Sequence, residues 1–216
     1  GAWQTQPTFS LTASGVYTLE YGSRDQAGNR EVTQTLPIKI DLQPPSTTLT
    51  KQGTLGNEGW YTSPVQINLT PADAVSGPGV TYYRVNAGAW VTGASFTLNT
   101  DGVHQIEYYS RDAAGNQESI KSDSARVDIQ GPTTTYLVAG APGDGAWFLS
   151  PVTVTLSVTD AVSGPTATYY RLDDGAWTAG VSLVVSGEAS HSLRFYSTDR
   201  AGNAEATRLV NINIDA

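Results

Sequence analysis

Apolar and polar residues alternate along several short stretches of the chain, which is the pattern of a strand with one buried face. In residues 65–70 every second side chain is apolar, and residues 152–158 show the same alternation. Clusters of Gly, Pro, Asn and Asp separate these stretches, and no stretch shows the period of a helix. The pattern therefore predicts an all-β chain made of short strands joined by turns.

The pattern returns after 87 residues, without a single insertion. Trp90 and Trp177 are one period apart, as are Asp112 and Asp199, and Trp3 supplies the same position one period before Trp90. Internal repeats of this regularity mark tandem structural units, so the period sets the expected domain organisation.

Two full units and one partial unit are expected. The full units are residues 43–130 and 131–216, and each is long enough to bury its own core. Residues 1–42 match only the second half of a unit, so we expect the chain to be cut from a longer array of repeats. Several short strands with frequent turn residues predict tandem immunoglobulin-like β-sandwich domains, each of about seven strands.

Positions that stay apolar in every copy predict which side chains point into the core. Their polar neighbours along the same strands are then expected to face water, because successive side chains of a strand point to opposite faces. The expected inward residues are Leu19, Tyr21, Ile106, Tyr108, Leu193 and Phe195, and the expected outward residues are Glu20, Glu107 and Arg194.

Composition narrows the class of protein further. The chain has no cysteine, which excludes disulfides and thiolate metal sites. Its net charge of -8 is spread thinly, whereas a nucleic-acid-binding protein needs a basic patch. No apolar run approaches the length of a membrane span. We expect neither nucleic acid nor membrane insertion among the interactions of this chain.

Three aspartate positions recur with the repeat. One opens the turn Asp-x-Ala-Gly-Asn, one opens the turn Asp-Ala-Val-Ser-Gly, and one ends each unit before a proline-containing segment. In an immunoglobulin-like sandwich both turns lie at one end of the domain, where the last strand of the preceding unit also arrives. The expected groups are Asp41, Asp73 and Asp112 at one junction, and Asp128, Asp160 and Asp199 at the next.

These aspartates allow two interpretations. Calcium takes six to eight oxygen ligands, so three carboxylates with carbonyls and water are a reasonable beginning of a calcium site. Alternatively, they are independent turn aspartates that accept hydrogen bonds from nearby backbone amides. Calcium is therefore the cofactor to test, although we do not expect the chain to require a cofactor.

Catalysis is not expected. His104 and His191 are one repeat position seen twice, and the first copy has Tyr17 there. A position that accepts tyrosine fills space in a strand and does not hold an essential proton or a metal ion. The prominent carboxylates recur in every unit, and enzymes rarely carry one active site per small repeat.

Aromatic residues with neighbouring arginines offer a binding hypothesis. Exposed Trp and Tyr rings can stack on sugars, whereas buried ones pack the core or a hairpin. The residues in question are Tyr82, Arg84 and Trp90 in one unit, and Tyr169, Arg171 and Trp177 in the next.

The string Tyr-Tyr-Arg-x-x-x-Gly-Ala-Trp, together with the Asp-x-Ala-Gly-Asn and Asp-Ala-Val-Ser-Gly turns, resembles bacterial immunoglobulin-like repeats of secreted and surface proteins. The Asp-x-x-Gly-Asn turn is shared with the OmpL-type outer-membrane repeat and the hyalin repeat. The resemblance covers nearly the whole chain. One departure is Asp173-Asp174, which stands where the preceding unit has Asn86-Ala87.

The resemblance implies an extracellular module beside an enzyme, or part of a rod in an adhesin or stalk. The leading hypothesis is a non-enzymatic, secreted or cell-surface tandem module that acts as a spacer for other domains of a longer chain. One alternative is a carbohydrate-binding or adhesive module that uses its exposed aromatic residues on glycans. Another is a subunit of a surface filament, assembled by self-association.

Overall fold

The computed structural model describes residues 4–5 and 8–216, so Trp3 lies outside the described residues. The all-β prediction is confirmed: the regular structure consists of strands, apart from the short 3₁₀ helix η1 (Asn57–Gly59). Within the described ranges, no helix has the length and apolar character needed to cross a membrane.

The first two strands form a two-stranded antiparallel sheet. β1 (Gly15–Tyr21) pairs with β2 (Gln34–Ile40) along its whole length. Leu19 is half-buried, but Tyr21, predicted to point inward, is 48% exposed. The physical reason is that β1 and β2 form a sheet of two strands only, which offers too little surface to bury a large ring.

Residues 46–127 form two sheets. One has the strand order β3-β5-β8 and the other has the order β4-β10-β9-β6-β7. The strands are β3 (Ser46–Gln52), β4 (Trp60–Tyr61), β5 (Val65–Ala72), β6 (Pro78–Val85), β7 (Val91–Thr92), β8 (Ser95–Leu98), β9 (Gly102–Asp112) and β10 (Lys121–Val127).

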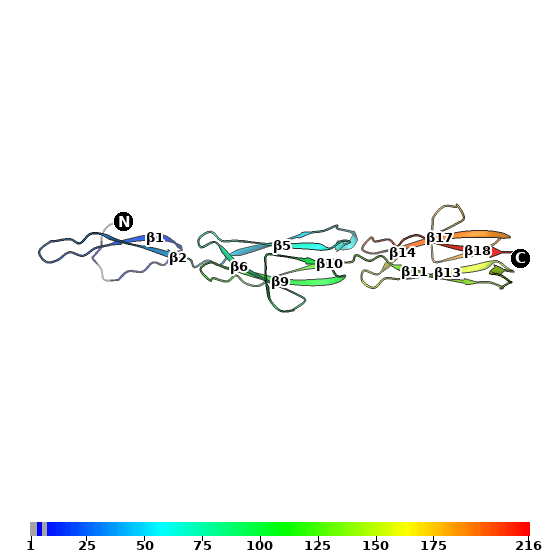
Figure 1. The fold of residues 1–216 in the computed structure, drawn as a ribbon, viewed down its shortest axis with the longest axis horizontal. Coiled ribbons are helices and arrows are strands. Elements are labelled where there is room, and N and C mark those ends of the chain that lie inside the picture. Colours follow the sequence, from blue (N-terminus) through cyan, green and yellow to red (C-terminus); the bar gives the residue numbers. More distant parts are fainter. Residues whose placement is uncertain (1–3, 6–7) are drawn as a thin grey trace. The chain divides into compact units, whose positions relative to one another are not determined.

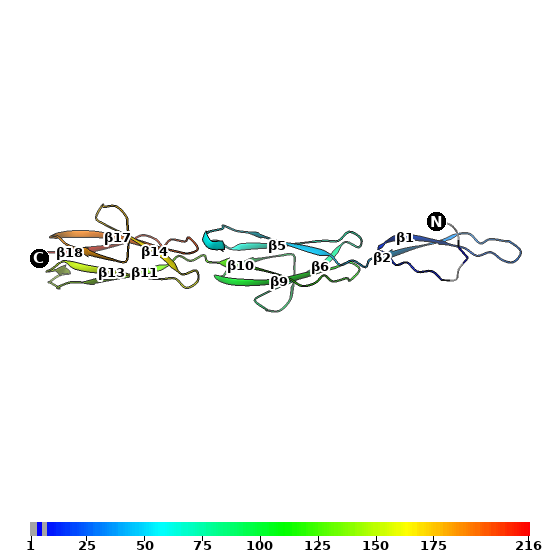
Figure 2. The ribbon, with the colours of Figure 1, turned by 180° about the vertical axis from the view of Figure 1, so that it is seen from behind.

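Residues 133–214 repeat this pair of sheets, with the orders β11-β13-β16 and β12-β18-β17-β14-β15. In both views β17 and β18 lie over β11 and β13 (Figures 1 and 2), as in a sandwich. The strands are β11 (Thr133–Ala139), β12 (Trp147–Phe148), β13 (Val152–Thr159), β14 (Pro165–Leu172), β15 (Thr178–Ala179), β16 (Ser182–Val185), β17 (Ala189–Asp199) and β18 (Arg208–Ile214).

Each of these eight strands begins 87 residues after its counterpart in the preceding sheet pair. The count exceeds the predicted seven because two strands of each pair are only two residues long. The repeated sheet pairs establish tandem immunoglobulin-like sandwiches. By its internal contacts the chain divides into two compact units. One unit contains residues up to 50, 68–95 and 106–123, and the other contains residues 51–67, 96–105 and 124–216. The domain boundaries at 42/43 and 130/131 stay a prediction.

The core follows the predicted alternation. Ile106, Leu193 and Phe195 have no exposed surface, and Tyr108 is 7% exposed. Apolar burial of this kind stabilises a fold by about 25 cal/mol per Å². The core of the last sheet pair consists of Val152, Val154, Leu156, Val185, Leu193, Phe195, Ile212 and Ile214.

A buried polar network joins the two sheets near β3 and β9. Glu118 accepts hydrogen bonds from the backbone N–H of Thr47 (3.0 Å) and of Ser110 (2.8 Å), and forms an ion pair with Lys121 (2.8 Å). The hydroxyls of Thr47 and Ser110 are 2.6 Å apart. The counterparts in the next copy are Thr134, Ser197, Glu205 and Arg208.

Burial acts against ionisation of Glu118, but hydrogen bonds from Lys121 and Thr47 outweigh it, so the pKa of Glu118 lies below its ordinary value. A carboxyl whose pKa is lower in the folded state stabilises the fold above its unfolded-state pKa. The stabilisation is lost as the pH falls through the folded-state value. It is therefore complete at neutral pH and starts to be lost near pH 4.5.

We expect Glu118→Ala to lower the free energy of unfolding by about 2–5 kcal/mol, because two buried N–H donors lose their acceptor at about 1–3 kcal/mol each. Urea denaturation measures this change. Glu31→Ala is the matched control, since Glu31 is the exposed counterpart of Glu118 one period earlier. Equal losses in the two variants would contradict the role of this network.

Candidate metal centre

The turn Asp-x-Ala-Gly-Asn is closed by its own side chains. Asp112 ends β9, and its two carboxylate oxygens accept hydrogen bonds from the backbone N–H and the side-chain amide of Asn116, both at 2.8 Å. Asp199 and Asn203 repeat both bonds at the same distances. Gly115 adopts a φ of 98°, a left-handed conformation that glycine tolerates without strain. These bonds hold the aspartate side chain in one place.

The turn Asp-Ala-Val-Ser-Gly is braced in the same manner. Asp73, just after β5, accepts a hydrogen bond from the backbone N–H of Gly77 at 2.8 Å. Asp160, just after β13, accepts the equivalent bond from Gly164 at 2.6 Å. In each case Oδ1 makes the bond.

The third aspartate of each set lies in a short segment between strands. Asp41 lies between β2 and β3, and its Oδ2 accepts a hydrogen bond from the N–H of Ser76 at 2.9 Å. Asp128 lies between β10 and β11 and accepts the equivalent bond from Ser163 at 3.0 Å. Both segments are thus tied to the turn that carries the second aspartate.

The structure brings the predicted aspartates together in two triads. The first triad is Asp41, Asp73 and Asp112, and the second is Asp128, Asp160 and Asp199. In each triad, one carboxylate oxygen per residue lies within 4.8 Å of the others. Oxygens bound to calcium at 2.3–2.6 Å are at most about 5.2 Å apart, so this spacing fits one coordination shell.

The two triads differ in burial and in hydrogen bonding. Asp128 has no exposed surface, and its Oδ1 is buried with no hydrogen-bond partner in the described part of the chain. Asp41 is half-buried, and both of its oxygens accept backbone N–H bonds, from Gln43 and Ser76. Ser76 and Gln43 lower the pKa of Asp41. A buried carboxylate oxygen without a partner costs free energy, so the carboxylates of the second triad are less well compensated than those of the first.

The histidines have a structural role that explains why tyrosine can replace them. The Nε2 of His104 lies 2.8 Å from the carbonyl oxygen of Thr100, and that of His191 lies 3.1 Å from that of Gly187. The hydroxyl of Tyr17 donates to the carbonyl of Ala13 at 2.9 Å. All three side chains contact the carbonyl four residues earlier, and none belongs to a triad.

The predicted aromatic residues of the first full repeat pack on one another. Tyr82 stacks on Tyr109 with ring centroids 4.9 Å apart, and Trp90 meets the same Tyr109 edge-on at 4.9 Å. The guanidinium of Arg84 lies 4.8 Å from the Trp90 ring centroid. Tyr109, which sequence analysis missed, is the centre of this row.

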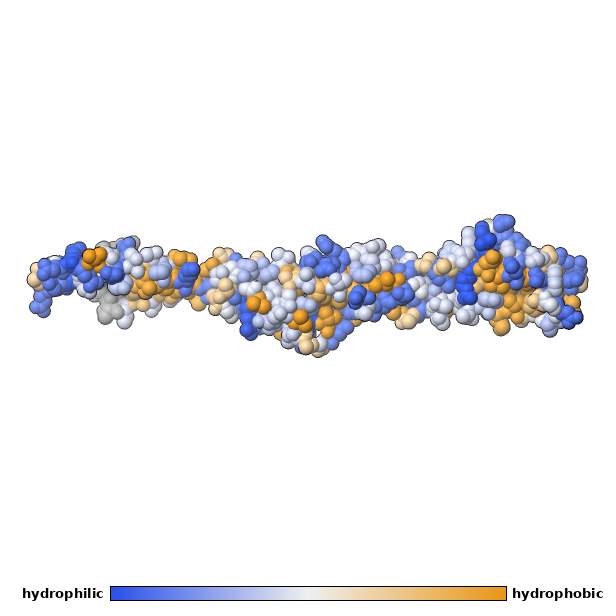
Figure 3. Space-filling model, viewed as in Figure 1, coloured by the Kyte–Doolittle hydropathy of each residue, from blue (hydrophilic) through white to orange (hydrophobic). Residues whose placement is uncertain are grey.

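The second row has the same order. Tyr169 stacks on Tyr196 at 5.2 Å, Trp177 meets Tyr196 edge-on at 4.9 Å, and Arg171 lies 5.2 Å from the Trp177 ring centroid. Trp177 remains 40% exposed. Apolar residues also reach the surface elsewhere, as patches among polar ones (Figure 3).

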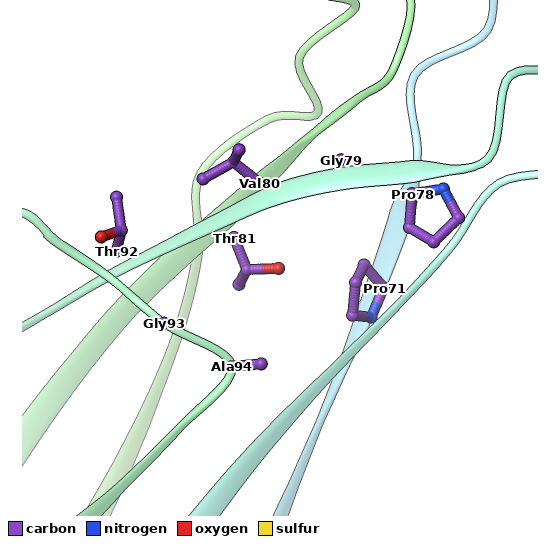
Figure 4. A pocket seen from close by; sticks show the side chains of 8 residues that line it. All are labelled: Pro71, Pro78, Gly79, Val80, Thr81, Thr92, Gly93 and Ala94. Carbon is purple, nitrogen blue, oxygen red and sulfur yellow. The ribbon is translucent and has the colours of Figure 1, made fainter.

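A hollow of about 420 Å³ lies beside β6 and β7, and Figure 4 shows the residues that line it. Its lining offers the hydroxyls of Thr81 and Thr92 and no ionisable side chain, so it contains no group for acid–base chemistry. The lining residues are Pro71, Pro78, Gly79, Val80, Thr81, Thr92, Gly93 and Ala94.

Among solved structures, the chain is similar to the fibronectin(III)-like modules of CbhA from Clostridium thermocellum. The identity is 12%, the match covers 77% of this chain and 94% of that chain, and the TM-score is 0.36. It is also similar to the D00-D0 domain of intimin, at 12% identity over 77% of this chain and 97% of that chain, with a TM-score of 0.35. These similarities concern the fold alone. No protein-family model and no curated protein matches the chain.

The Asp173–His191 pair makes part of the stability depend on pH. Their side chains are 3.1 Å apart, and hydrogen bonds to Asp173 and to Gly187 raise the pKa of His191. The backbone N–H of Ser192 and then His191 lower the pKa of Asp173. A histidine with a raised pKa stabilises the fold fully below its unfolded-state pKa, and this stabilisation is lost as the pH rises through the folded-state value.

We expect an NMR titration of the His191 ring to give a midpoint above the ordinary value of about 6.5. Asp173→Asn should lower the midpoint, because it removes the charged acceptor. The pair is partly exposed, so the accompanying change in unfolding free energy between pH 6 and 8 should stay below about 1 kcal/mol. A midpoint that Asp173→Asn leaves unchanged would show that the pair does not interact in solution.

Proposed function

We propose that this chain is a non-catalytic tandem module of a secreted or cell-surface protein, and that it spaces other domains of a longer chain. The repeated immunoglobulin-like sheet pairs support this proposal, because each repeats the other at a fixed period. The conspicuous carboxylates are engaged in turns, and the hydroxyl–carboxylate network around Glu118 is buried away from any substrate.

The short segments between sheets support the spacer role. Five residues separate β2 from β3, and five separate β10 from β11. The side-chain amide of Asn116 donates to the carbonyl of Asp41 at 3.1 Å, and that of Asn203 donates to the carbonyl of Asp128 at 2.9 Å. Pro132 is buried, and proline restricts its own backbone. A short segment held at its carbonyls has little freedom to bend.

Removing the Asn203 amide should loosen this segment. We expect Asn203→Ala to increase the independent motion of residues 131–216, measured by ¹⁵N relaxation, because the carbonyl of Asp128 loses its donor. Asn29→Ala is the control: Asn29 bonds Asp25 in the same kind of turn, and no bond from its side-chain amide to a linking segment is described. Unchanged relaxation in Asn203→Ala would argue against a pinned segment.

The second triad is proposed to bind calcium. The observation that carries this is the buried, unpartnered Oδ1 of Asp128 beside the carboxylates of Asp160 and Asp199. These three residues would supply oxygen ligands, and backbone carbonyls or water would supply the rest. The cation would offset two of the three negative charges and join the segment after β10 to both turns. No catalytic step is assigned to it.

Calcium should therefore raise the melting temperature. Extracellular calcium sites have dissociation constants of about 0.1–1 mM. At 10 mM calcium such a site contributes about 1–3 kcal/mol, which corresponds to a rise of roughly 5–15 °C for a domain of this size. Differential scanning calorimetry in calcium and in chelator measures it. A melting temperature that is the same in both would exclude the calcium site and leave the spacer proposal intact.

Asp128→Asn tests the ligand directly, and Asp41→Asn is the matched control from the first triad. We expect Asp128→Asn to lose the calcium response while melting in chelator close to the parent chain. Asp41→Asn should keep the response, because Asp41 belongs to the first triad and is not a ligand of the proposed site. If Asp128→Asn lowers the melting temperature by the same amount in calcium and in chelator, the role of Asp128 is only to accept the hydrogen bond from the backbone N–H of Ser163.

A further inference from the structure

One cross-strand pair on the outer face of the five-stranded sheet differs in charge between the two full repeats. In the first, Arg84 of β6 lies directly opposite Glu107 of β9. In the second, Arg171 of β14 lies directly opposite Arg194 of β17. The period aligns Glu107 with Arg194, so a carboxylate in one copy is replaced by a second guanidinium in the other.

In the first copy the guanidinium is neutralised inside the chain. Arg84 Nε and Glu107 Oε2 are 2.7 Å apart, and Glu107 raises the pKa of Arg84. The same guanidinium lies over Trp90. This arrangement of one carboxylate, one arginine and one indole is complete without an external group.

In the second copy two like charges oppose each other without a carboxylate. Within the described ranges, the Nε atoms of Arg171 and Arg194 are both buried and have no hydrogen-bond partner. Like charges directly opposite on a sheet are destabilising, and buried donors without acceptors cost further free energy. This pair therefore lacks the acceptor that Glu107 provides in the first copy.

The acidic residue nearest in sequence does not fill this gap. Asp173 accepts a hydrogen bond from the backbone N–H of Ser192 at 2.9 Å, and its other oxygen lies 3.1 Å from His191. Both of its oxygens are thus used at the turn. Asp173 therefore offers the two arginines no acceptor, and both arginines are only half-buried, so a ligand from solvent can reach them.

The surroundings of the pair indicate what carries this acceptor. Arg171 lies over Trp177, which stays 40% exposed, and Leu209, opposite Arg194 on β18, is 51% exposed. A ligand with a carboxylate and a ring that has apolar C–H faces can contact all of these groups. The electron-rich face of an indole attracts such C–H groups.

We propose that Arg171 and Arg194 bind the carboxylate of a uronic-acid sugar whose ring lies against Trp177. The planar guanidinium matches a planar carboxylate, and Arg84 and Glu107 form a guanidinium–carboxylate ion pair within this chain. The net charge of -8 opposes densely charged polyanions, so a single uronic acid in an otherwise neutral glycan fits best. This binding goes beyond the spacer function and does not depend on it.

The experiment is an NMR titration of the full chain with sodium glucuronate, followed on the indole N–H signals. We expect the Trp177 signal to shift with millimolar affinity while the Trp90 signal does not move. Glucose is the neutral control, and acetate is the carboxylate without a ring. Both should bind at least tenfold more weakly. Equal shifts with glucose, or no shift with glucuronate, would overturn the proposal.

The chain supplies its own reciprocal variants. Arg194→Glu recreates the internal pair of the first copy, so it should keep or raise the melting temperature and abolish the Trp177 shift. Glu107→Arg recreates the arginine pair beside Trp90 and should transfer a glucuronate-dependent shift to Trp90. A Trp177 shift that persists in Arg194→Glu would overturn the site. A tetraglutamate peptide that binds more tightly than glucuronate would also overturn it, since the occupant would then be a protein.

Discussion

The arrangement of the first triad depends on the hydrogen bonds that the side-chain amide of Asn116 donates. Its nitrogen donates to the carboxylate of Asp112 at 2.8 Å and to the carbonyl of Asp41 at 3.1 Å. The first bond closes the turn after β9, and the second holds the segment after β2. One side chain therefore satisfies a turn aspartate and a linking backbone at once. Asn203 repeats both bonds one period later.

The same arrangement concentrates negative charge. Each turn needs an acceptor for its backbone N–H groups, and aspartate provides one close to its own backbone. When two such turns and a linking segment meet, three carboxylates lie within 4.8 Å of one another. Backbone donors compensate all the oxygens of Asp41 but leave Oδ1 of Asp128 without a partner. The proposed calcium site thus arises from turn geometry, and the burial of Asp128 is what distinguishes the second triad from the first.

Comparison of the two full repeats also separates residues with a structural role from residues that serve one copy alone. The pairs Thr47 and Ser110, and Thr134 and Ser197, occupy the same positions and make the same contacts, which indicates a role in joining the sheets. A position whose chemistry changes between copies is more informative about binding. Arg194 of the second copy stands at the position of Glu107 in the first. The second copy therefore lacks this internal carboxylate, while its aromatic row stays in place. Two repeats of the same fold that differ in one charged residue can thus carry a binding site in one copy alone.

The sequence by itself determined the all-β class, the period of 87 residues, the inward positions of the full repeats and the turn aspartates, because alternation and turn chemistry are local properties. It did not reveal the network around Glu118, whose partner Thr47 is 71 residues away in the chain. Nor did it reveal that Arg171 and Arg194 face each other, since strand register decides which side chains are opposite. Burial of Asp128 was likewise decided by the tertiary structure, because only packing determines which of several similar aspartates loses contact with water.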